Sequence, residues 1–184
     1  STCYKFYYEK SIERISLFYK KYPKYDELKK INNFNVPDTQ SLLKNIPWDN
    51  LCNGESFFIH GDLQFDNILY DEKKKSFLLL DWRQDFGGYI NFGDIYYDLA
   101  KLYGGILLNY DYIKLNLLQY KESETDVHFD FANRFNTNLY LNIFENYILS
   151  KNYDLKRVKI LVGLIYLNMA PLHHYPFDKL LYAF

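Results

Sequence analysis

The sequence predicts a single mixed α+β domain that is mostly helical and covers residues 1–184. Apolar side chains recur at helical spacing in several stretches, and two short apolar runs flank a charged turn in the manner typical of a β-hairpin. No stretch rich in Pro, Gly or Ser divides the chain. Hydrophobic residues make up 48% of the chain and aromatic residues 20%, which favours a folded domain with its own core.

The N-terminal stretch, residues 4–21, predicts an amphipathic helix. Ile12, Ile15 and Tyr19 fall on one face of such a helix, with charged residues on the opposite side. Pro23 follows closely and is expected to end the helix.

The next stretch predicts a connection and then a short helix. Residues 22–37 contain Asn and Pro residues that interrupt regular structure. Asp38 can cap a short helix over residues 39–46, which Pro47 stops. Residues 56–60 contain a short apolar run, and we expect a strand or an extended segment there.

The middle of the chain carries a hairpin signal. Asn67–Tyr70 and Ser76–Leu80 are apolar runs on either side of the charged residues 71–75. We interpret the three lysines of this turn, Lys73–Lys75, as solvated residues rather than as a phosphate clamp.

The C-terminal half predicts mostly helices. Gly87, Gly88 and Gly93 mark a flexible loop, after which Asp94 can cap a helix. Further helices are expected over residues 111–121, 132–150 and 154–169, with a polar loop over residues 121–130 and a tail interrupted by Pro171 and Pro176.

The charge and composition exclude several classes of protein. The net charge is −1 and the pI is about 6.4, without the basic field that nucleic-acid binding requires. No apolar run approaches the roughly 20 residues needed to span a bilayer, and the N-terminus has no signal-peptide pattern. Cys3 and Cys52 form no metal-binding pair and are interpreted as reduced thiols, although a disulfide between them stays open. These features indicate a cytoplasmic protein without membrane insertion and without a nucleic-acid partner.

Three polar residues have the types and spacing that a phosphoryl-transfer site needs. Asn67 lies five positions after Asp62, and Asp81 directly follows an apolar run. The reaction requires a positioned acceptor hydroxyl and metal ions that neutralise phosphate charge. Asp62 can orient the hydroxyl and take its proton, while Asn67 and Asp81 offer the hard oxygen ligands that Mg²⁺ prefers.

These residues stand in longer motifs that resemble a known family. The motifs are His60-Gly61-Asp62 with Asn67-Ile68-Leu69, then Leu80-Asp81-Trp82, then Gly93-Asp94-Ile95-Tyr96-Tyr97-Asp98-Leu99-Ala100. Together they resemble the C-terminal lobe of the aminoglycoside phosphotransferase and choline/ethanolamine kinase family, which has a protein-kinase-like fold. The resemblance is dense over residues 56–105 and implies Mg²⁺ as cofactor and ATP as phosphate donor.

The resemblance also implies a role for each matching residue. Asp62 matches the catalytic-loop acid, and Asn67 and Asp81 match the metal-binding amide and the metal-binding acid. Asp98 matches a buried acid that supports the catalytic loop, and His60 matches a residue that organises this loop.

A literal Asp85-Phe86-Gly87 tripeptide competes with Asp81 for the metal-binding position. Asp85 lies 18 residues after Asn67 in a glycine-rich loop, whereas Asp81 lies 14 residues after Asn67 at the end of a strand. We therefore assign the metal to Asp81, and Asp85 becomes a weaker candidate for contact with the acceptor substrate.

The lobe that covers the nucleotide in this family has no counterpart in the sequence. The 59 residues before His60 contain neither a glycine-rich loop nor a strand with the nucleotide-binding lysine. Three explanations stay open: the chain is a fragment of a longer protein, another chain supplies the lobe, or the domain has lost catalysis. As a fragment, this chain alone is expected to be inactive.

The leading functional hypothesis is transfer of the ATP γ-phosphate to a hydroxyl of an amino alcohol such as choline or ethanolamine. The loop over residues 85–92 combines aromatic residues with Asp85, which suits a cationic acceptor. A sugar or aminosugar is the next candidate acceptor. Two other classes stay open: a non-catalytic kinase-like binding module, and a metal hydrolase built from His60, Asp62, His173 and His174.

Overall fold

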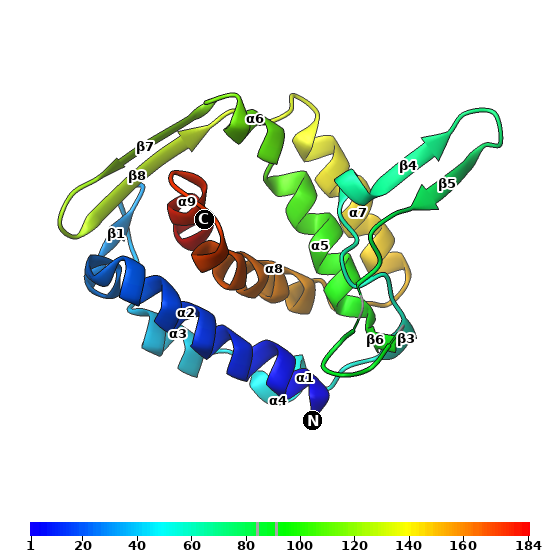
Figure 1. The fold of residues 1–184 in the computed structure, drawn as a ribbon, viewed down its shortest axis with the longest axis horizontal. Helices are drawn as coiled ribbons and strands as arrows, with labels where there is room; N and C mark the ends of the chain where they lie inside the picture. Colours follow the sequence, from blue (N-terminus) through cyan, green and yellow to red (C-terminus); the bar gives the residue numbers. More distant parts are fainter. Residues whose placement is uncertain (84, 91) are drawn as a thin grey trace.

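The computed structural model describes residues 1–83, 85–90 and 92–184, and its helices and small sheets confirm the mixed α+β class (Figure 1). The α-helices are α1 (Thr2–Tyr4), α2 (Lys10–Lys21), α3 (Thr39–Lys44), α4 (Trp48–Leu51), α5 (Ile95–Leu107), α6 (Tyr110–Lys114), α7 (Thr137–Ser150), α8 (Leu155–Met169) and α9 (Phe177–Ala183). Shorter helical turns are η1 (Lys5–Glu9), η2 (Pro23–Glu27), η3 (Phe65–Asn67) and η4 (Ala170–Leu172). The strands are β1 (Lys30–Ile31), β2 (Phe34–Asn35), β3 (Ser56–Phe58), β4 (Ile68–Asp71), β5 (Ser76–Leu79), β6 (Phe92–Asp94), β7 (Leu118–Glu122) and β8 (Asp126–Phe131). Among the described residues, no helix combines the length and the apolar character that crossing a membrane requires.

Helix α8 lies at the centre of the molecule. It packs against α5, α2 and α9, and Figure 1 shows it between the blue N-terminal helix and the green α5. Val158 and Leu161 of α8, Ile148 of α7 and Leu180 of α9 are completely buried. Burying an aliphatic side chain of this size stabilises the fold by about 1.5–3 kcal/mol. These contacts join helices from both ends of the chain into one core.

The predicted helix over residues 4–21 is confirmed, with a π-helical turn near its start. The segments α1, η1 and α2 follow one another without a break. The buried face differs in part from the predicted one, because Ile15 is buried but Ile12 is 41% exposed. Ser11 and Phe18 are buried with Ile15, and these three residues share the i, i+4, i+7 spacing of one helical face.

The connection over residues 22–37 contains more structure than predicted. Besides η2, it holds the antiparallel pair β1–β2, and β1 also pairs in parallel with β8. The turn between β1 and β2 uses Asn32 and Asn33, whose φ angles are 47° and 69°. The predicted helix cap is confirmed, because Ser41 N donates a hydrogen bond to Asp38 Oδ1 at 2.9 Å.

Two predictions for the C-terminal half are wrong. The helix expected over residues 111–121 ends at Lys114, and the loop expected over residues 121–130 belongs to an antiparallel pair of β7 and β8 (Figure 1). Asn116 has a φ of 58°, a left-handed conformation that ends a helix. The helix expected over residues 132–150 begins only at Thr137, whereas the helix expected over 154–169 is present as α8.

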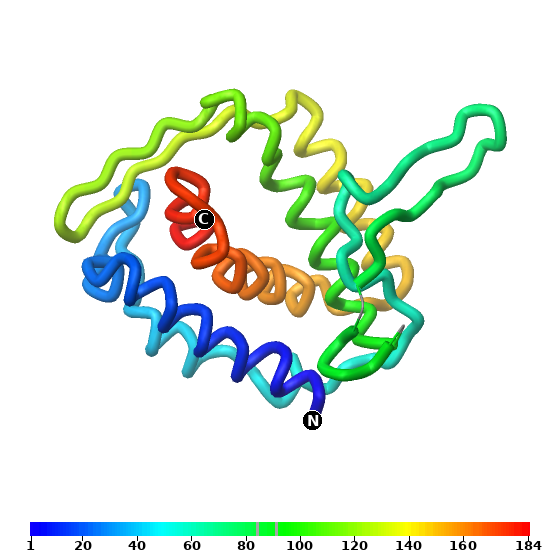
Figure 2. Tube along the Cα trace, viewed as in Figure 1, coloured from blue at the N-terminus to red at the C-terminus, as the bar shows by residue number. Residues whose placement is uncertain are grey.

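The predicted hairpin in the middle of the chain is confirmed as β4–β5. The strands pair from Ile68 with Leu79 to Asp71 with Ser76. Asp71 Oδ1 accepts hydrogen bonds from the backbone N–H groups of the next turn, which fixes its shape. Figure 2 shows this hairpin projecting away from the helical body.

A second strand pair places the predicted site beside α5. Strand β3 pairs with β6, with Ser56 opposite Asp94 and Phe58 opposite Phe92. Asp94 caps α5 as predicted, because its Oδ1 accepts a hydrogen bond from Tyr96 N at 3.3 Å. The segment that leaves β3 therefore runs along the first turns of α5. Gly93, expected in a flexible loop, lies in β6 instead.

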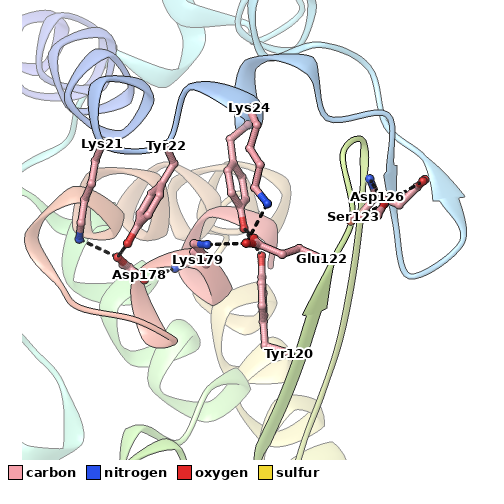
Figure 3. A network of polar contacts seen from close by, with 10 residues as sticks. Lys21, Tyr22, Lys24, Tyr120, Glu122, Ser123, Asp126, Asp178 and Lys179 are labelled. Atoms are coloured by element: carbon pink, nitrogen blue, oxygen red, sulfur yellow. Dashed lines mark hydrogen bonds and ion pairs between the residues drawn. The ribbon is translucent and has the colours of Figure 1, made fainter.

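The C-terminal helix is attached to the N-terminal part of the chain by a network of charged and phenolic side chains (Figure 3). Lys21 Nζ and Tyr22 Oη each lie 2.7 Å from Asp178 Oδ2. Glu122 on β7 accepts hydrogen bonds from Lys179 Nζ at 2.7 Å and from Tyr25 Oη at 2.6 Å. The network links α2, η2, β7 and α9.

Candidate active site

The predicted catalytic residues lie on the segment between β3 and β4 and at the end of β5. Residues 60–64 form a loop, η3 follows, and Asn67 is its last residue. Leu80 N donates a hydrogen bond to Asn67 O at 2.8 Å, so the end of β5 is adjacent to the start of β4. Asp62, Asn67 and Asp81 are thereby brought to one end of the hairpin.

Asp98 on α5 holds the start of this loop. Its Oδ2 accepts a hydrogen bond from His60 N at 2.7 Å, and its Oδ1 accepts one from Gly61 N at 2.8 Å. Gly61 has a φ of 78°, a left-handed conformation that glycine adopts without strain. Burial raises the pKa of Asp98, and the two backbone hydrogen bonds oppose this increase. These hydrogen bonds join the start of the loop to α5, and the supporting role of Asp98 stays a prediction.

The His60 side chain joins the loop to β5. Its Nε2 lies 2.7 Å from Leu80 O, and its Nδ1 accepts a hydrogen bond from Asp62 N at 3.3 Å. Since Nδ1 accepts, Nε2 carries the proton and donates it to Leu80 O. The imidazole is buried against the Trp82 ring, with 4.7 Å between the ring centroids. Both ring nitrogens are occupied by backbone groups, which suits an organising role rather than proton transfer.

The Asp62 carboxylate has three side-chain neighbours. Lys101 Nζ lies 2.8 Å from Asp62 Oδ1, and Asn67 Nδ2 and Gln64 Nε2 lie 3.3 Å and 3.4 Å from Oδ2. Lys101 was missed by the sequence reasoning. It lies three residues after Asp98 on α5, so the two side chains share a helix face, and this spacing was the available signal.

Asn67 and Asp81, the predicted Mg²⁺ ligands, lie near the start of β4 and the end of β5 and offer an amide oxygen and a carboxylate. Asn67 Nδ2 donates to Asp62 O at 2.9 Å, so its Oδ1 faces away from that contact, and no described residue donates to it. Asp81 is exposed and lies two residues after the last residue of β5, Leu79, with a φ of 52°, a strained conformation that is common at functional sites. Mg²⁺ is usually held by one or two protein oxygen ligands together with substrate phosphates and water. Within the described ranges, no three or more His, Cys, Asp or Glu side chains are grouped for metal binding.

Asp85 lies beyond the end of β5, in a different environment from Asp81. The following residue, Phe86, is buried against Phe6, with 4.1 Å between the ring centroids. Gly87 and Gly88 form an ordered turn closed by a hydrogen bond from Phe86 N to Tyr89 O at 2.8 Å. Asp85 itself is exposed. Gln84 immediately precedes the predicted acceptor loop over residues 85–92, and Asn91 belongs to it; both lie outside the described residues.

The hydrolase alternative gains no support from these contacts. The His173 ring packs on Tyr110 and Phe177, with centroid distances of 6.2 Å and 4.9 Å. Both nitrogens of the His60 ring are engaged by backbone groups, Leu80 O and Asp62 N. Cys3 and Cys52 are both free thiols in the structure.

The chain matches no protein-family model, no curated protein and no solved structure. The family resemblance of the motifs therefore stays a prediction.

Proposed function

We propose that this domain carries the acceptor and metal side of a small-molecule kinase, which transfers the γ-phosphate of ATP to an alcohol hydroxyl. The observation that carries the proposal is the arrangement around Asp62. A partly exposed carboxylate is held by Lys101 and Asn67, on a loop fixed by two hydrogen bonds to the buried Asp98.

Each side chain of the site has a task in this reaction. Asp62 orients the acceptor hydroxyl and takes its proton as the new O–P bond forms. Lys101 Nζ, 2.8 Å from Asp62, supplies positive charge beside the transferring phosphoryl group. Asn67 and Asp81 would hold Mg²⁺, which neutralises phosphate charge when it is bound.

The β4–β5 hairpin offers a surface for the nucleotide-binding lobe that the motif resemblance implies. Several large apolar side chains of β3, β4 and β5 are more than half exposed, and a group of this kind marks an interaction surface. They are Phe57, Phe58, Tyr70, Phe77 and Leu78. In this proposal the lobe lies over the hairpin and places ATP between itself and Asn67.

The acceptor is proposed to be an amino alcohol such as choline or ethanolamine, or a sugar or aminosugar. The second candidate function, a kinase-like binding module without catalysis, is favoured by one contact. Lys101 forms an ion pair with Asp62 and so competes with an acceptor hydroxyl for this carboxylate.

The test is an assay of Mg²⁺-dependent ATP consumption in the longest natural form of the protein, against choline, ethanolamine and aminosugars. Turnover with one of these alcohols is expected, and Asp62→Asn is expected to reduce kcat by about 100-fold or more. Asp66→Asn, which changes an exposed neighbour on η3, serves as the matched control. Binding of Mg²⁺ and ATP without turnover of any alcohol would refute the kinase and support the binding module.

A further inference from the structure

A small cavity lined by basic side chains lies next to the catalytic loop. Its volume is about 100 Å³. Lys10 and Arg14 line it from α2, Arg83 from the segment after β5, and Lys101 from α5. The other lining residues are apolar or neutral side chains, largely from α8, and no carboxylate contributes to the wall within the described ranges.

The positive charges of this cavity are poorly compensated. Lys101 pairs with Asp62, whereas Lys10, Arg14 and Arg83 form no ion pair with any described residue. Burial, followed by repulsion from Arg83 and Arg14, lowers the pKa of Lys10 to about 8. The charges of Asp85 and Glu13 oppose this decrease and do not cancel it. An anion placed in the cavity would relieve the repulsion.

Two buried polar atoms near this cavity have no hydrogen-bond partner among the described residues. They are Nε of Arg14, a donor, and Oδ1 of Asn168, an acceptor. The Asn168 amide is fixed by hydrogen bonds from Nδ2 to Ser11 Oγ at 2.9 Å and to Leu164 O at 2.7 Å, so Oδ1 cannot exchange places with Nδ2. Buried polar atoms are normally satisfied, and both residues line the cavity. The Arg14 Nε donor can bond an oxyanion directly, whereas Asn168 Oδ1 can only accept from a hydroxyl of the bound group.

The cavity shares a wall with the catalytic loop. Arg83 N donates a hydrogen bond to His60 O at 3.0 Å. A Cβ atom on Gly61 would lie only 2.6 Å from Arg83 Cβ, so the Arg83 side chain packs directly on the residue before Asp62. Lys101 contacts Asp62 and also lines the cavity. A group bound there is therefore adjacent to the proposed site of phosphoryl transfer.

We propose that this cavity binds an oxyanion group, a phosphate ester or a carboxylate, that belongs to the acceptor alcohol. Guanidinium groups such as those of Arg14 and Arg83 bind oxyanions with paired hydrogen bonds. Assigning the anion to the acceptor rests on the proposed kinase function, whereas binding of the anion does not. On this basis an amino alcohol or sugar that carries an acidic group is preferred as acceptor over the same alcohol without that group.

Inorganic phosphate is the first probe, applied to the unchanged chain without nucleotide or metal. The rate at which an amine-reactive reagent labels Lys10 near pH 8 is followed by mass spectrometry, with chloride at equal ionic strength as the reference. Phosphate is expected to slow labelling of Lys10 several-fold and to leave the exposed Lys20 of the same helix unaffected. If phosphate slows labelling of Lys10 and Lys20 by the same factor, the proposed anion site is refuted.

Substitutions separate this cavity from general surface charge. Arg14→Gln is expected to abolish the protection of Lys10 by phosphate, whereas Lys20→Gln, which removes the same charge from the same helix, is expected to retain it. If phosphate still protects Lys10 from labelling in Arg14→Gln, Arg14 is not part of an anion site and the proposal is contradicted. If Arg14→Gln does not fold, the labelling of Lys10 and Lys20 in the unchanged chain, with and without phosphate, is the test of the anion site.

Paired acceptors test whether the anion belongs to the substrate. Two alcohols that differ only in a phosphate or carboxylate group are compared by kcat/KM with Mg²⁺ and ATP. We expect the anionic member to be preferred, and the preference to be lost in Arg14→Gln. Turnover that favours uncharged or cationic alcohols would refute the acceptor assignment and leave the kinase standing. Protection of Lys10 without any turnover would refute the kinase and leave the anion site standing.

Discussion

Asp98 accepts hydrogen bonds from two consecutive backbone N–H groups in a buried environment, so the conformation of the loop over residues 60–64 depends on it. Asp98→Ala leaves the N–H groups of His60 and Gly61 without an acceptor, and each unsatisfied buried group costs about 1–3 kcal/mol. We expect a lower melting temperature and faster amide hydrogen exchange at these two residues. Asp66→Ala, on the exposed side of η3, is the control. Unchanged exchange at both N–H groups would show that Asp98 does not hold the loop.

Asp81 and Asp85 differ in their surroundings, and this difference yields a second prediction. Asp81 follows Leu80, whose backbone N–H donates a hydrogen bond to Asn67 O, whereas Asp85 lies next to the buried Phe86. Asp81→Asn is expected to reduce Mg²⁺-dependent turnover by about 100-fold or more, and Asp85→Asn is expected to retain most of it. Measuring the Mg²⁺ dependence of both variants checks this. A larger loss of Mg²⁺-dependent turnover in Asp85→Asn than in Asp81→Asn would assign the metal to Asp85 instead.

The sequence suggested candidate site residues that stand in contiguous motifs, and it missed candidates that only the fold brings together. Asp62, Asn67 and Asp98 were recognised from spacing and resemblance, and their contacts suit the predicted roles. Lys101 was missed because its contact with Asp62 joins residues 39 positions apart in the sequence. The basic cavity was missed for the same reason, since its lysines and arginines are spread over α2, α5 and the segment after β5.

At the scale of secondary structure, the sequence predicted the hairpin whose turn and strands carry local signals. It did not predict the strands whose formation depends on pairing with a distant strand. The hairpin β4–β5 has two apolar runs and a turn fixed by Asp71, so local sequence specified it. Residues 118–131 alternate apolar and polar side chains around a turn closed by Ser123 and Asp126, but their many charged residues favoured a loop. They form strands because β8 pairs with both β7 and β1. Pairing with a strand far away in sequence cannot be read from helical or alternating periodicity alone.

The attachment of β7 to η2 and α9 depends on the ionised form of Glu122. Burial of its carboxyl raises the pKa, but hydrogen bonds from Lys179, Lys24 and Tyr25 outweigh this and lower it to about 2. The group is more acidic in the folded state than in the unfolded state, where its pKa is near 4.5. Its contribution to stability is therefore complete above about pH 5 and is lost as the pH falls toward 2.

Glu122→Gln should remove this pH dependence. Melting temperatures between pH 2 and pH 6 are expected to fall less steeply in the variant than in the parent protein, with a lower value at pH 6. Glu124→Gln, at an exposed position of the β7–β8 turn, is the control. Parallel curves for Glu122→Gln and the parent would contradict the assigned linkage.

At the scale of the whole molecule, one buried ion pair connects α8 to the β3–β6 strand pair, whose strand β3 precedes the loop over residues 60–64. Arg157 Nη2 lies 2.7 Å from Asp94 Oδ2 and also donates to Leu51 O at 3.0 Å. Tyr7 Oη donates to the same Asp94 oxygen at 2.8 Å. The N-terminal helix, the start of α5 and the central helix therefore meet at Asp94.

Arg157→Leu leaves the buried Asp94 carboxylate without its cation. Removing one partner of a buried pair costs about 3–5 kcal/mol, and we expect a loss of this size in the free energy of unfolding measured with urea. Lys156→Leu introduces the same residue at an adjacent exposed position and should change stability by less than about 1 kcal/mol. Similar losses in the two variants would show that the pair is not important for stability.

The projecting β4–β5 hairpin has a consequence for how the chain is cleaved. Its turn is exposed and carries three lysines, Lys73–Lys75, and the hairpin is held by its own strand pairs rather than by the core. Exposed turns are preferred sites of proteolytic nicking. Trypsin is therefore expected to cut first within this turn, giving two fragments that stay associated through the helical body. Protection of the turn in a larger assembly would locate the surface that a partner lobe covers.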